Sequence, residues 1–191
     1  MAPKDDEQTE PETQDAPGPM LDMSQASVKK MVAKAKARGF ITYDELNEGD
    51  TATFTRTLTE DELVLFAAVS GDVNPVHLDS EFAAGSMFKE RIAHGMWSGS
   101  LISAALATVM PGPGTIYLDQ SLSFKRPVKL DDTLTVQLKI LRKEPKGRVV
   151  VQCDVRNQND QKVVTGEAKV IAPSEKVSLH KPRLPKITIE N

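Results

Sequence analysis

Residues 95–118 read GMWSGSLISAALATVMPGPGTIYL, and these 24 residues contain no charged side chain. The turn-forming sequence PGPG at 111–114 leaves about 16 residues for a helix before it, whereas a membrane span needs roughly 20. Small and apolar residues lie on every side of this helix, as is typical of a helix inside a protein. The segment therefore predicts a buried central helix rather than a membrane span.

Four segments with strand-like sequences follow this helix, at 115–126, 133–143, 148–157 and 162–171. The second shows the clearest alternation, because every other residue is apolar: Leu134, Val136, Leu138 and Ile140. Turn-forming sequences separate neighbouring segments, EPKG at 144–147 and NQND at 157–160, and they favour antiparallel hairpins. With a further strand expected at 51–57, the pattern predicts an α+β fold in which an antiparallel sheet wraps the long helix.

The chain around this region divides by charge and composition. Residues 1–23 are acidic and proline-rich, and we expect them to be disordered because they can bury little apolar surface. Residues 24–39 carry five basic and no acidic side chains, and they predict a basic helix. This helix either lies solvated on the domain or attracts a membrane or an acidic partner. Residues 40–172 form the predicted domain, and residues 173–191 a tail or linker.

The overall composition limits the class of protein. The chain has 191 residues, a formal net charge of −3 and 39% hydrophobic residues, which suits one soluble domain and gives no reason to expect nucleic-acid binding. Its one cysteine, Cys153, excludes an internal disulfide and a cysteine-rich zinc site. The first residues, MAPKDDEQTE, lack the apolar core of a secretory signal, so we expect a cytoplasmic protein.

A loop of unusual composition precedes the long helix. A helix opened by Thr59 and Glu62 is expected to stop at SGDVNPVHLD (70–79), because Pro75 disfavours helical geometry at the residue before it. This loop can aim Asp72 and His77 at one point, and a carboxylate with an imidazole suits general acid–base chemistry near neutral pH. Taken alone, the same two residues would also fit a surface ion pair or a carboxylate that caps a turn. A short helix is expected after the loop, from about residue 80 to 88.

A second feature is the sequence IAHGM at 92–96, at the start of the long helix. Free N–H groups at a helix N-terminus favour an anion or a developing oxyanion, and Gly95 has no side chain to obstruct an approaching carbonyl. Composition alone would also allow a simple turn glycine at this position.

Three segments together resemble one known family. FAAVSGDVNPVH (66–77), IAHGM (92–96) and TIYLDQSLSFKRPV (115–128) are similar to the (R)-specific enoyl-CoA hydratases, or MaoC-like dehydratases, and the resemblance runs from about residue 42 to 172. It implies a single hot-dog fold, in which a curved antiparallel sheet wraps a long central helix, and assembly as a homodimer. It also implies reversible syn addition of water to trans-2-enoyl-CoA, giving (R)-3-hydroxyacyl-CoA.

The same resemblance assigns site residues. Asp72 and His77 match the catalytic pair, Gly95 the residue whose amide polarises the thioester carbonyl, Ser103 a polar residue near the pocket, and Asn74 a residue that holds the loop. Which member of the pair protonates the α-carbon is left open by the sequence. The implied substrate is an enoyl-CoA, and no cofactor is expected beyond the coenzyme A that the substrate carries.

Other functions fit the sequence less well. A hot-dog acyl-CoA thioesterase would commonly have a carboxylate on or beside the central helix, and residues 95–118 have none. A non-catalytic acyl-CoA-binding protein remains an alternative that only turnover can decide. The three histidines lack the spacing of a metal-binding motif, so no metal site is expected, and neither a serine-hydrolase elbow nor a G-x-G-x-x-G sequence is present.

Three smaller features allow two interpretations each. Lys125 and Arg126 fit either coenzyme A phosphates or a solvated strand end. Trp97 would either limit the length of the acyl chain or fill the core. The sequence APSEKV at 172–177 resembles the linker after hydratase domains that are fused to phosphate acyltransferases, which implies a possible functional link to such an enzyme.

Overall fold

The computed structural model describes residues 41–175 and 184–189. The regular elements in this part of the chain lie between residues 43 and 171, inside the predicted domain. In chain order they are η1 (Tyr43–Glu45), β1 (Thr51–Thr57), α2 (Glu60–Ser70), α3 (Pro75–Leu78), α4 (Ser80–Gly85), α5 (Gly95–Thr108), β2 (Ile116–Gln120), β3 (Ser123–Phe124), β4 (Thr133–Glu144), β5 (Arg148–Arg156) and β6 (Lys162–Ile171). The predicted disordered segment 1–23, the basic helix 24–39 and part of the tail 173–191 fall outside the described residues.

The strands form one antiparallel sheet in the order β1-β4-β5-β6-β2, and β3 also pairs with β6. Within the described chain the edge strands β1 and β2 do not pair with each other, so the sheet is not closed into a barrel. The hairpin between β4 and β5 and that between β5 and β6 confirm the expected neighbours. The alternating apolar residues of β4 are fully buried, as predicted: Leu134, Val136, Leu138 and Ile140.

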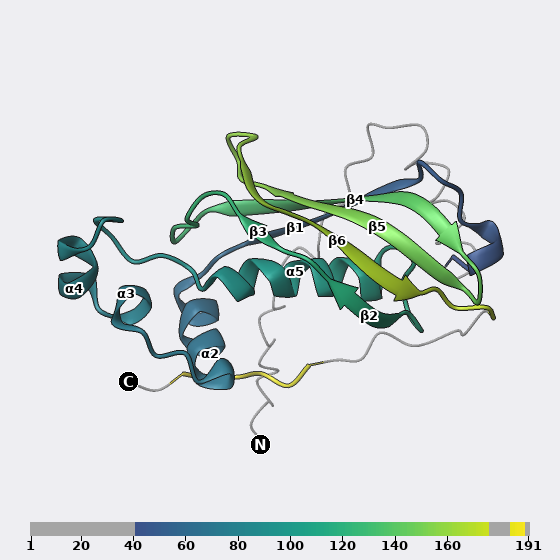
Figure 1. The fold of residues 1–191 in the computed structure, drawn as a ribbon. Helices are drawn as coiled ribbons and strands as arrows, with labels where there is room; N and C mark the ends of the chain where they lie inside the picture. The colour runs from purple at the N-terminus through teal and green to yellow at the C-terminus, as the bar shows by residue number, and fades with distance from the viewer. Residues whose placement is uncertain (1–40, 176–183, 190–191) are drawn as a thin grey trace, which may run out of the picture.

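The central helix α5 lies along the concave side of the curved sheet (Figure 1). It contacts β1, β4 and β5 and buries Trp97, Leu101, Ile102, Ala105 and Leu106. Its opposite face is exposed in the single chain and carries mostly small residues: Met96, Ser100, Ser103 and Ala107. The predicted buried helix is confirmed on the side that the sheet covers, and among the described residues no helix is long and apolar enough to span a membrane.

The segment predicted as one strand at 115–126 is divided into β2 and β3. The break lies opposite Gly166 of β6, where a Cβ atom would overlap with the main-chain carbonyl of Ser121. Ser121 also donates its N–H to the carbonyl of Glu167 at 2.9 Å, so the two strands approach each other closely here. A glycine on a different strand therefore permits the close approach at this break, which the local sequence of 115–126 could not indicate.

Two helices differ in detail from the helices that the sequence predicts. Thr59 caps α2 as expected, since its hydroxyl accepts a hydrogen bond from the Glu62 N–H at 3.2 Å, but the Glu62 carboxylate pairs with Arg56 instead of completing the capping box. The helix expected from 80 to 88 ends at Gly85, because the hydroxyl of Ser86 accepts from the Phe88 N–H and stabilises a turn.

Candidate active site

The loop after α2 is shaped by three residues of the sequence SGDVNP. Gly71 ends α2 with a φ of +74°, a left-handed conformation that glycine adopts without strain. Asn74 caps α3 through its Oδ1 atom, which accepts from the Val76 N–H at 3.2 Å, and Pro75 occupies the first helical position, where it needs no N–H. Asp72 therefore lies in an exposed loop, and His77 lies on the short helix α3 rather than in the loop itself.

The side chains of Asp72 and His77 face each other. Oδ2 of Asp72 lies 4.0 Å from Nε2 of His77, whose side chain is buried whereas that of Asp72 is about half exposed. Nδ1 of His77 lies 2.8 Å from the carbonyl oxygen of Ile92. Because a carbonyl oxygen only accepts, Nδ1 carries the proton of the neutral ring and the Nε2 lone pair faces the carboxylate. The two facing atoms are thus both acceptors, and a water molecule to one side of the line that joins them can donate to both.

Asn74 also contacts the carboxylate. Its main-chain N–H donates to Oδ1 of Asp72 at 3.3 Å, so Oδ1 is held while Oδ2 faces His77. The resemblance assigned Asn74 to holding the loop, and the structure gives this residue two hydrogen bonds within the loop and the start of α3.

A cavity of about 340 Å³ adjoins this pair. It is lined by His77, by residues 92–95 that lead into α5, and by residues 124–128 at the end of β3 and just after it. Gly95 is the first residue of α5, and the first N–H groups of a helix have no partner within the helix. The cavity therefore combines an imidazole, apolar walls and a helix N-terminus that favours negative charge.

The segment that leads into α5 is held firmly. The Ala93 N–H donates to the Val128 carbonyl at 2.7 Å, and Arg91 forms two hydrogen bonds with the Glu60 carboxylate, at 2.7 and 2.6 Å. The hydrogen bonds from Arg91 hold the pKa of Glu60 below its ordinary value. These contacts hold the start of α5 against α2 and against the segment that follows β3.

The structure brings four of the five predicted site residues to one end of the molecule and separates the fifth. Asp72, Asn74, His77 and Gly95 lie at or beside the cavity, whereas Ser103 lies two turns along α5 on its exposed face and does not line it. Ser98, one helical turn from Gly95, is buried and lines the cavity instead. Only the helical phase relative to the sheet distinguishes these two serines.

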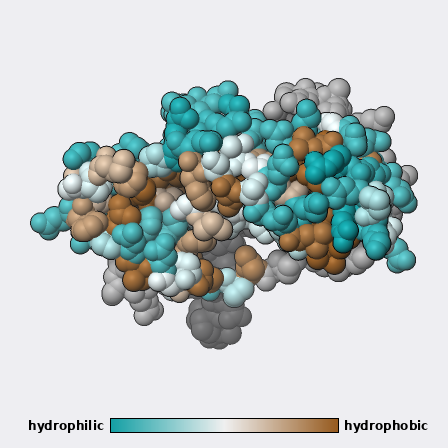
Figure 2. Space-filling model, viewed as in Figure 1, coloured by the Kyte–Doolittle hydropathy of each residue, from teal (hydrophilic) through white to brown (hydrophobic). Residues whose placement is uncertain are grey.

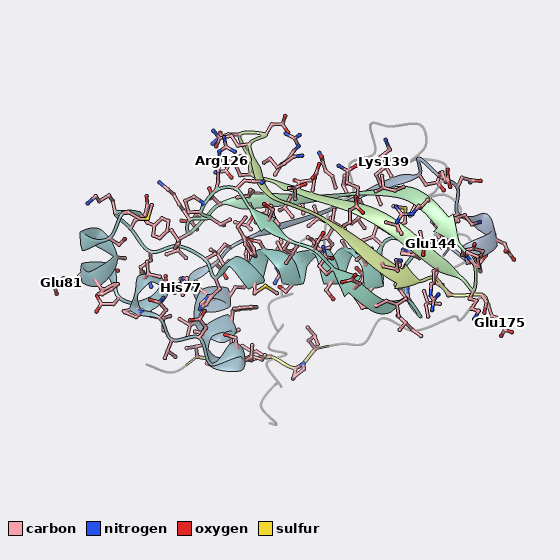
Figure 3. The ribbon with its side chains drawn as sticks, viewed as in Figure 1. His77, Glu81, Arg126, Lys139, Glu144 and Glu175 are labelled. Carbon is pink, nitrogen blue, oxygen red and sulfur yellow. The ribbon has the colours of Figure 1, made fainter. Side chains whose placement is uncertain are left out.

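Three other residues can now be placed. Trp97 is buried in the core and does not line the cavity, in keeping with the core-filling interpretation. Lys125 and Arg126 line the cavity with exposed side chains, and Arg126 donates to the Lys162 carbonyl at 2.9 Å. Figure 3 shows Arg126 and His77 at the same end of the molecule.

His94 is a site residue that the sequence interpretation missed. Its ring lies 3.9 Å from the ring of His77, and its Nε2 lies 2.9 Å from the main-chain oxygen of Asp72. The motif IAHGM contains His94, but only the folded chain brings it against a loop 22 residues earlier.

Asp72, His77 and His94 are also the group with the best potential to hold a metal ion in the described chain, since their ligand atoms lie within 4.8 Å of one another. One nitrogen of each ring faces a main-chain carbonyl oxygen, and the two ring planes are tilted by 31°.

Comparisons with known proteins agree on one family for the predicted domain, and a second family model matches a short segment before it. Residues 45–163 match the model of the MaoC like domain, and residues 22–49 match that of sigma-70 factor region 1.1. An (R)-specific enoyl-CoA hydratase of Rhodospirillum rubrum is 39% identical over 132 residues, covering 69% of this chain and 92% of that protein. An (R)-specific enoyl-CoA hydratase of Aeromonas caviae is 40% identical over 129 residues, covering 67% of this chain and 96% of the relative.

A solved structure supports the same relationship. The R-hydratase PhaJ1 from Pseudomonas aeruginosa, in its unliganded form, is 58% identical and superposes with a TM-score of 0.77, covering 79% of this chain and 97% of that one.

Proposed function

This chain belongs to the MaoC-like domain family and has its hot-dog fold, and on that premise we propose that it is an (R)-specific enoyl-CoA hydratase, a hydro-lyase. The observation that carries the proposal is the pair of facing acceptors, Asp72 Oδ2 and His77 Nε2, 4.0 Å apart beside a cavity that also contains the start of α5. A cavity of this kind suits a reaction that needs a held water molecule and a stabilised oxyanion.

The thioester carbonyl is proposed to bind at the N–H of Gly95. This hydrogen bond and the positive end of α5 draw electron density toward the carbonyl oxygen, which makes the β-carbon electrophilic and stabilises the enolate formed on attack. Loss of a single donor of this type costs about 2.7–4 kcal/mol of transition-state stabilisation in other enzymes.

The attacking water is proposed to lie between Asp72 and His77. A water molecule about 2.8 Å from each acceptor fits across their 4.0 Å separation. One water proton passes to Asp72 as the oxygen bonds to the β-carbon, and the electrons of the double bond move toward the thioester. A proton from one of the pair then bonds to the α-carbon, so that one complete water molecule is added. Which residue returns this proton stays open.

The stereochemistry follows from the placement of the pair. Both side chains are proposed to face one side of the bound substrate, so that the hydroxyl group and the proton arrive on the same face. We propose that this face gives the (R)-product.

Substrate binding is proposed to involve Lys125 and Arg126. Both side chains are exposed at the cavity, where they could contact the phosphates of coenzyme A. We propose no cofactor besides this coenzyme A.

Assembly as a homodimer is a further part of the proposal. Strand β2 is an edge strand with exposed apolar side chains, Ile116 and Leu118, and apolar surface is visible around β2 in Figure 2. The exposed face of α5, which includes Ser103, would also be available to a second copy. Such a patch is typical of an interface.

Two remaining proposals concern the location of the protein in the cell and its functional link to another enzyme. A cytoplasmic location is proposed from the cysteine content, since a chain with one cysteine needs no internal disulfide and proteins without disulfides are usual in a reducing compartment. A functional link to a phosphate acyltransferase is proposed from the resemblance of residues 172–177 alone.

The test follows the loss of enoyl absorbance when the purified protein meets crotonyl-CoA, with the product trapped by (R)- or (S)-specific 3-hydroxyacyl-CoA dehydrogenase. Product only in the (R)-specific reaction supports the proposal. Release of free thiol would instead identify the thioesterase alternative. Binding of enoyl-CoAs of several lengths without turnover would identify a non-catalytic binding protein.

A further inference from the structure

His94 is the residue that contacts each part of the proposed site. It precedes Gly95, its ring stacks on that of His77 at 3.9 Å, and its Nε2 lies 2.9 Å from the main-chain oxygen of Asp72. The residue is 2% exposed, and Phe66 packs against its ring at 5.1 Å. A buried histidine held on several sides has a fixed ring orientation.

The hydrogen bond to Asp72 has no equivalent elsewhere in the loop. The other hydrogen bonds found for residues 71–75 join neighbours no more than four positions apart in the chain. Within the described chain, the bond from His94 is therefore the one that ties this exposed segment to a distant element. Without it, the main chain that carries the Asp72 carboxylate would be held only by local turns.

The two ring nitrogens of His94 are consistent with a residue that holds the main chain of Asp72. Because the Asp72 carbonyl oxygen can only accept, Nε2 of His94 donates. Nδ1 is buried and has no hydrogen-bond partner among the described residues. A residue selected only for packing would have no need of these two polar atoms, and an unpartnered buried atom has a cost in stability. The histidine is thus explained by the one bond that it does make.

We propose that His94 is a positioning residue for hydration. Its Nε2–H holds the Asp72 main chain, so that Oδ2 of Asp72 and Nε2 of His77 face each other across the water position. The role rests on the proposed function, because it matters for catalysis only if Asp72 and His77 act on a bound water.

Three substitutions separate positioning from packing. In His94→Gln the amide nitrogen can occupy the position of Nε2 and donate to Asp72. In His94→Asn the side chain is too short to do so, and His94→Phe keeps a stacked ring without any donor. A positioning role predicts that the Gln variant retains more activity than the Phe variant, whereas a packing role predicts the opposite order.

The experiment measures kcat and KM for crotonyl-CoA with each variant, after thermal melting has shown that each is folded. We expect kcat to fall about 100-fold in His94→Phe and His94→Asn, as a misplacement near 1 Å can cause, with little change in KM and most of the loss recovered in His94→Gln. A Phe variant that is as active as the wild type, or more active than the Gln variant, would overturn the proposal.

Hydrogen exchange of the main chain keeps this test independent of the reaction. We expect faster amide exchange in peptides that cover residues 71–77 in His94→Phe than in the wild type, with unchanged exchange in β5, and wild-type protection in His94→Gln. Unchanged exchange in 71–77 would show that His94 does not hold the loop. An inactive wild-type enzyme whose loop still loosens in His94→Phe would instead contradict the proposed function and leave the hydrogen bond established.

Discussion

The ring of Phe124 covers Gly95 so closely that a Cβ atom at Gly95 would lie 3.1 Å from its Cε1 atom. Both residues line the cavity, and the half-exposed phenyl ring forms the wall next to the helix N-terminus. The absence of a side chain at Gly95 therefore lets the Phe124 ring pack against the start of α5, beside the proposed position of the thioester carbonyl.

Replacement of Gly95 by alanine is predicted to reduce kcat/KM for crotonyl-CoA by about tenfold or more, equivalent to about 1.4 kcal/mol. The added methyl group occupies the approach to the amide and moves the Phe124 ring by a few tenths of an ångström. The double variant Gly95→Ala/Phe124→Ala should recover part of the loss, since the ring can no longer be displaced into the cavity. Gly85→Ala is the control, because a Cβ atom there meets no other atom within 4 Å.

Substitution of Asp72 by asparagine is predicted to lower kcat about 10²–10⁴-fold, the usual contribution of a general base. The change keeps the shape of the side chain but removes the proton acceptor that faces His77. His77→Gln should cause a comparable loss, and the double variant should be little worse than either, because the two residues act on one water. Asp61→Asn, an exposed carboxylate on α2, serves as the control. Near wild-type turnover in a folded Asp72→Asn protein would remove Asp72 from the catalytic role.

The parts of the fold set by local pattern were predictable from the sequence. The uncharged helix before PGPG, the alternation of β4 and the two hairpins all depend on residues close together in the chain, and the structure has each of them. The break between β2 and β3 depends on Gly166 across the sheet, which no local pattern reveals.

The same distinction applies to the site. The spacing from Asp72 to His77, with Pro75 between them, predicted that the two side chains could meet, and they lie 4.0 Å apart. The importance of His94 depends on a hydrogen bond between residues 22 positions apart. The choice between Ser98 and Ser103 depends on which face of α5 the sheet covers, and this is a property of the packing rather than of the helix sequence.

The thiol of Cys153 is predicted to be unreactive in the folded protein. It is fully buried on β5, and this burial raises its pKa to about 12, so almost no thiolate is present near neutral pH. A thiol reagent such as DTNB should therefore label the native protein negligibly at pH 8 and label one thiol per chain once denaturant unfolds it. Rapid labelling under native conditions would contradict the buried position of this strand.

The contact between Glu60 and Arg91 is predicted to contribute to stability at neutral pH and to be lost in acid. Hydrogen bonds from Arg91 lower the pKa of Glu60 from its ordinary value of 4.5, so the folded state binds its proton less readily than the unfolded state. The contribution is therefore present above this value and disappears as the pH falls through the lower pKa of the folded protein.

The measurement compares the melting temperatures of the wild type and Glu60→Gln at pH 7 and in acid. The variant should melt at a slightly lower temperature at pH 7, by an amount limited by the exposure of Glu60, and the difference should shrink in acid. Glu81→Gln, at an exposed carboxylate on α4, serves as the control. A difference that is equal at both pH values would show that the charge of Glu60 is not involved.

The placement of Asp72 and His77 on one side of the substrate is tested most directly by the stereochemistry of hydration in D₂O. The product of crotonyl-CoA is collected at early times, before the reverse reaction exchanges further protons, and the coupling between its C2 and C3 protons is measured by NMR. We predict a single diastereomer with an (R)-hydroxyl group and one deuterium at C2 on the face to which the hydroxyl was added. The opposite diastereomer, or a mixture of both, would show that Asp72 and His77 do not deliver the hydroxyl oxygen and the deuterium to the same face of the substrate.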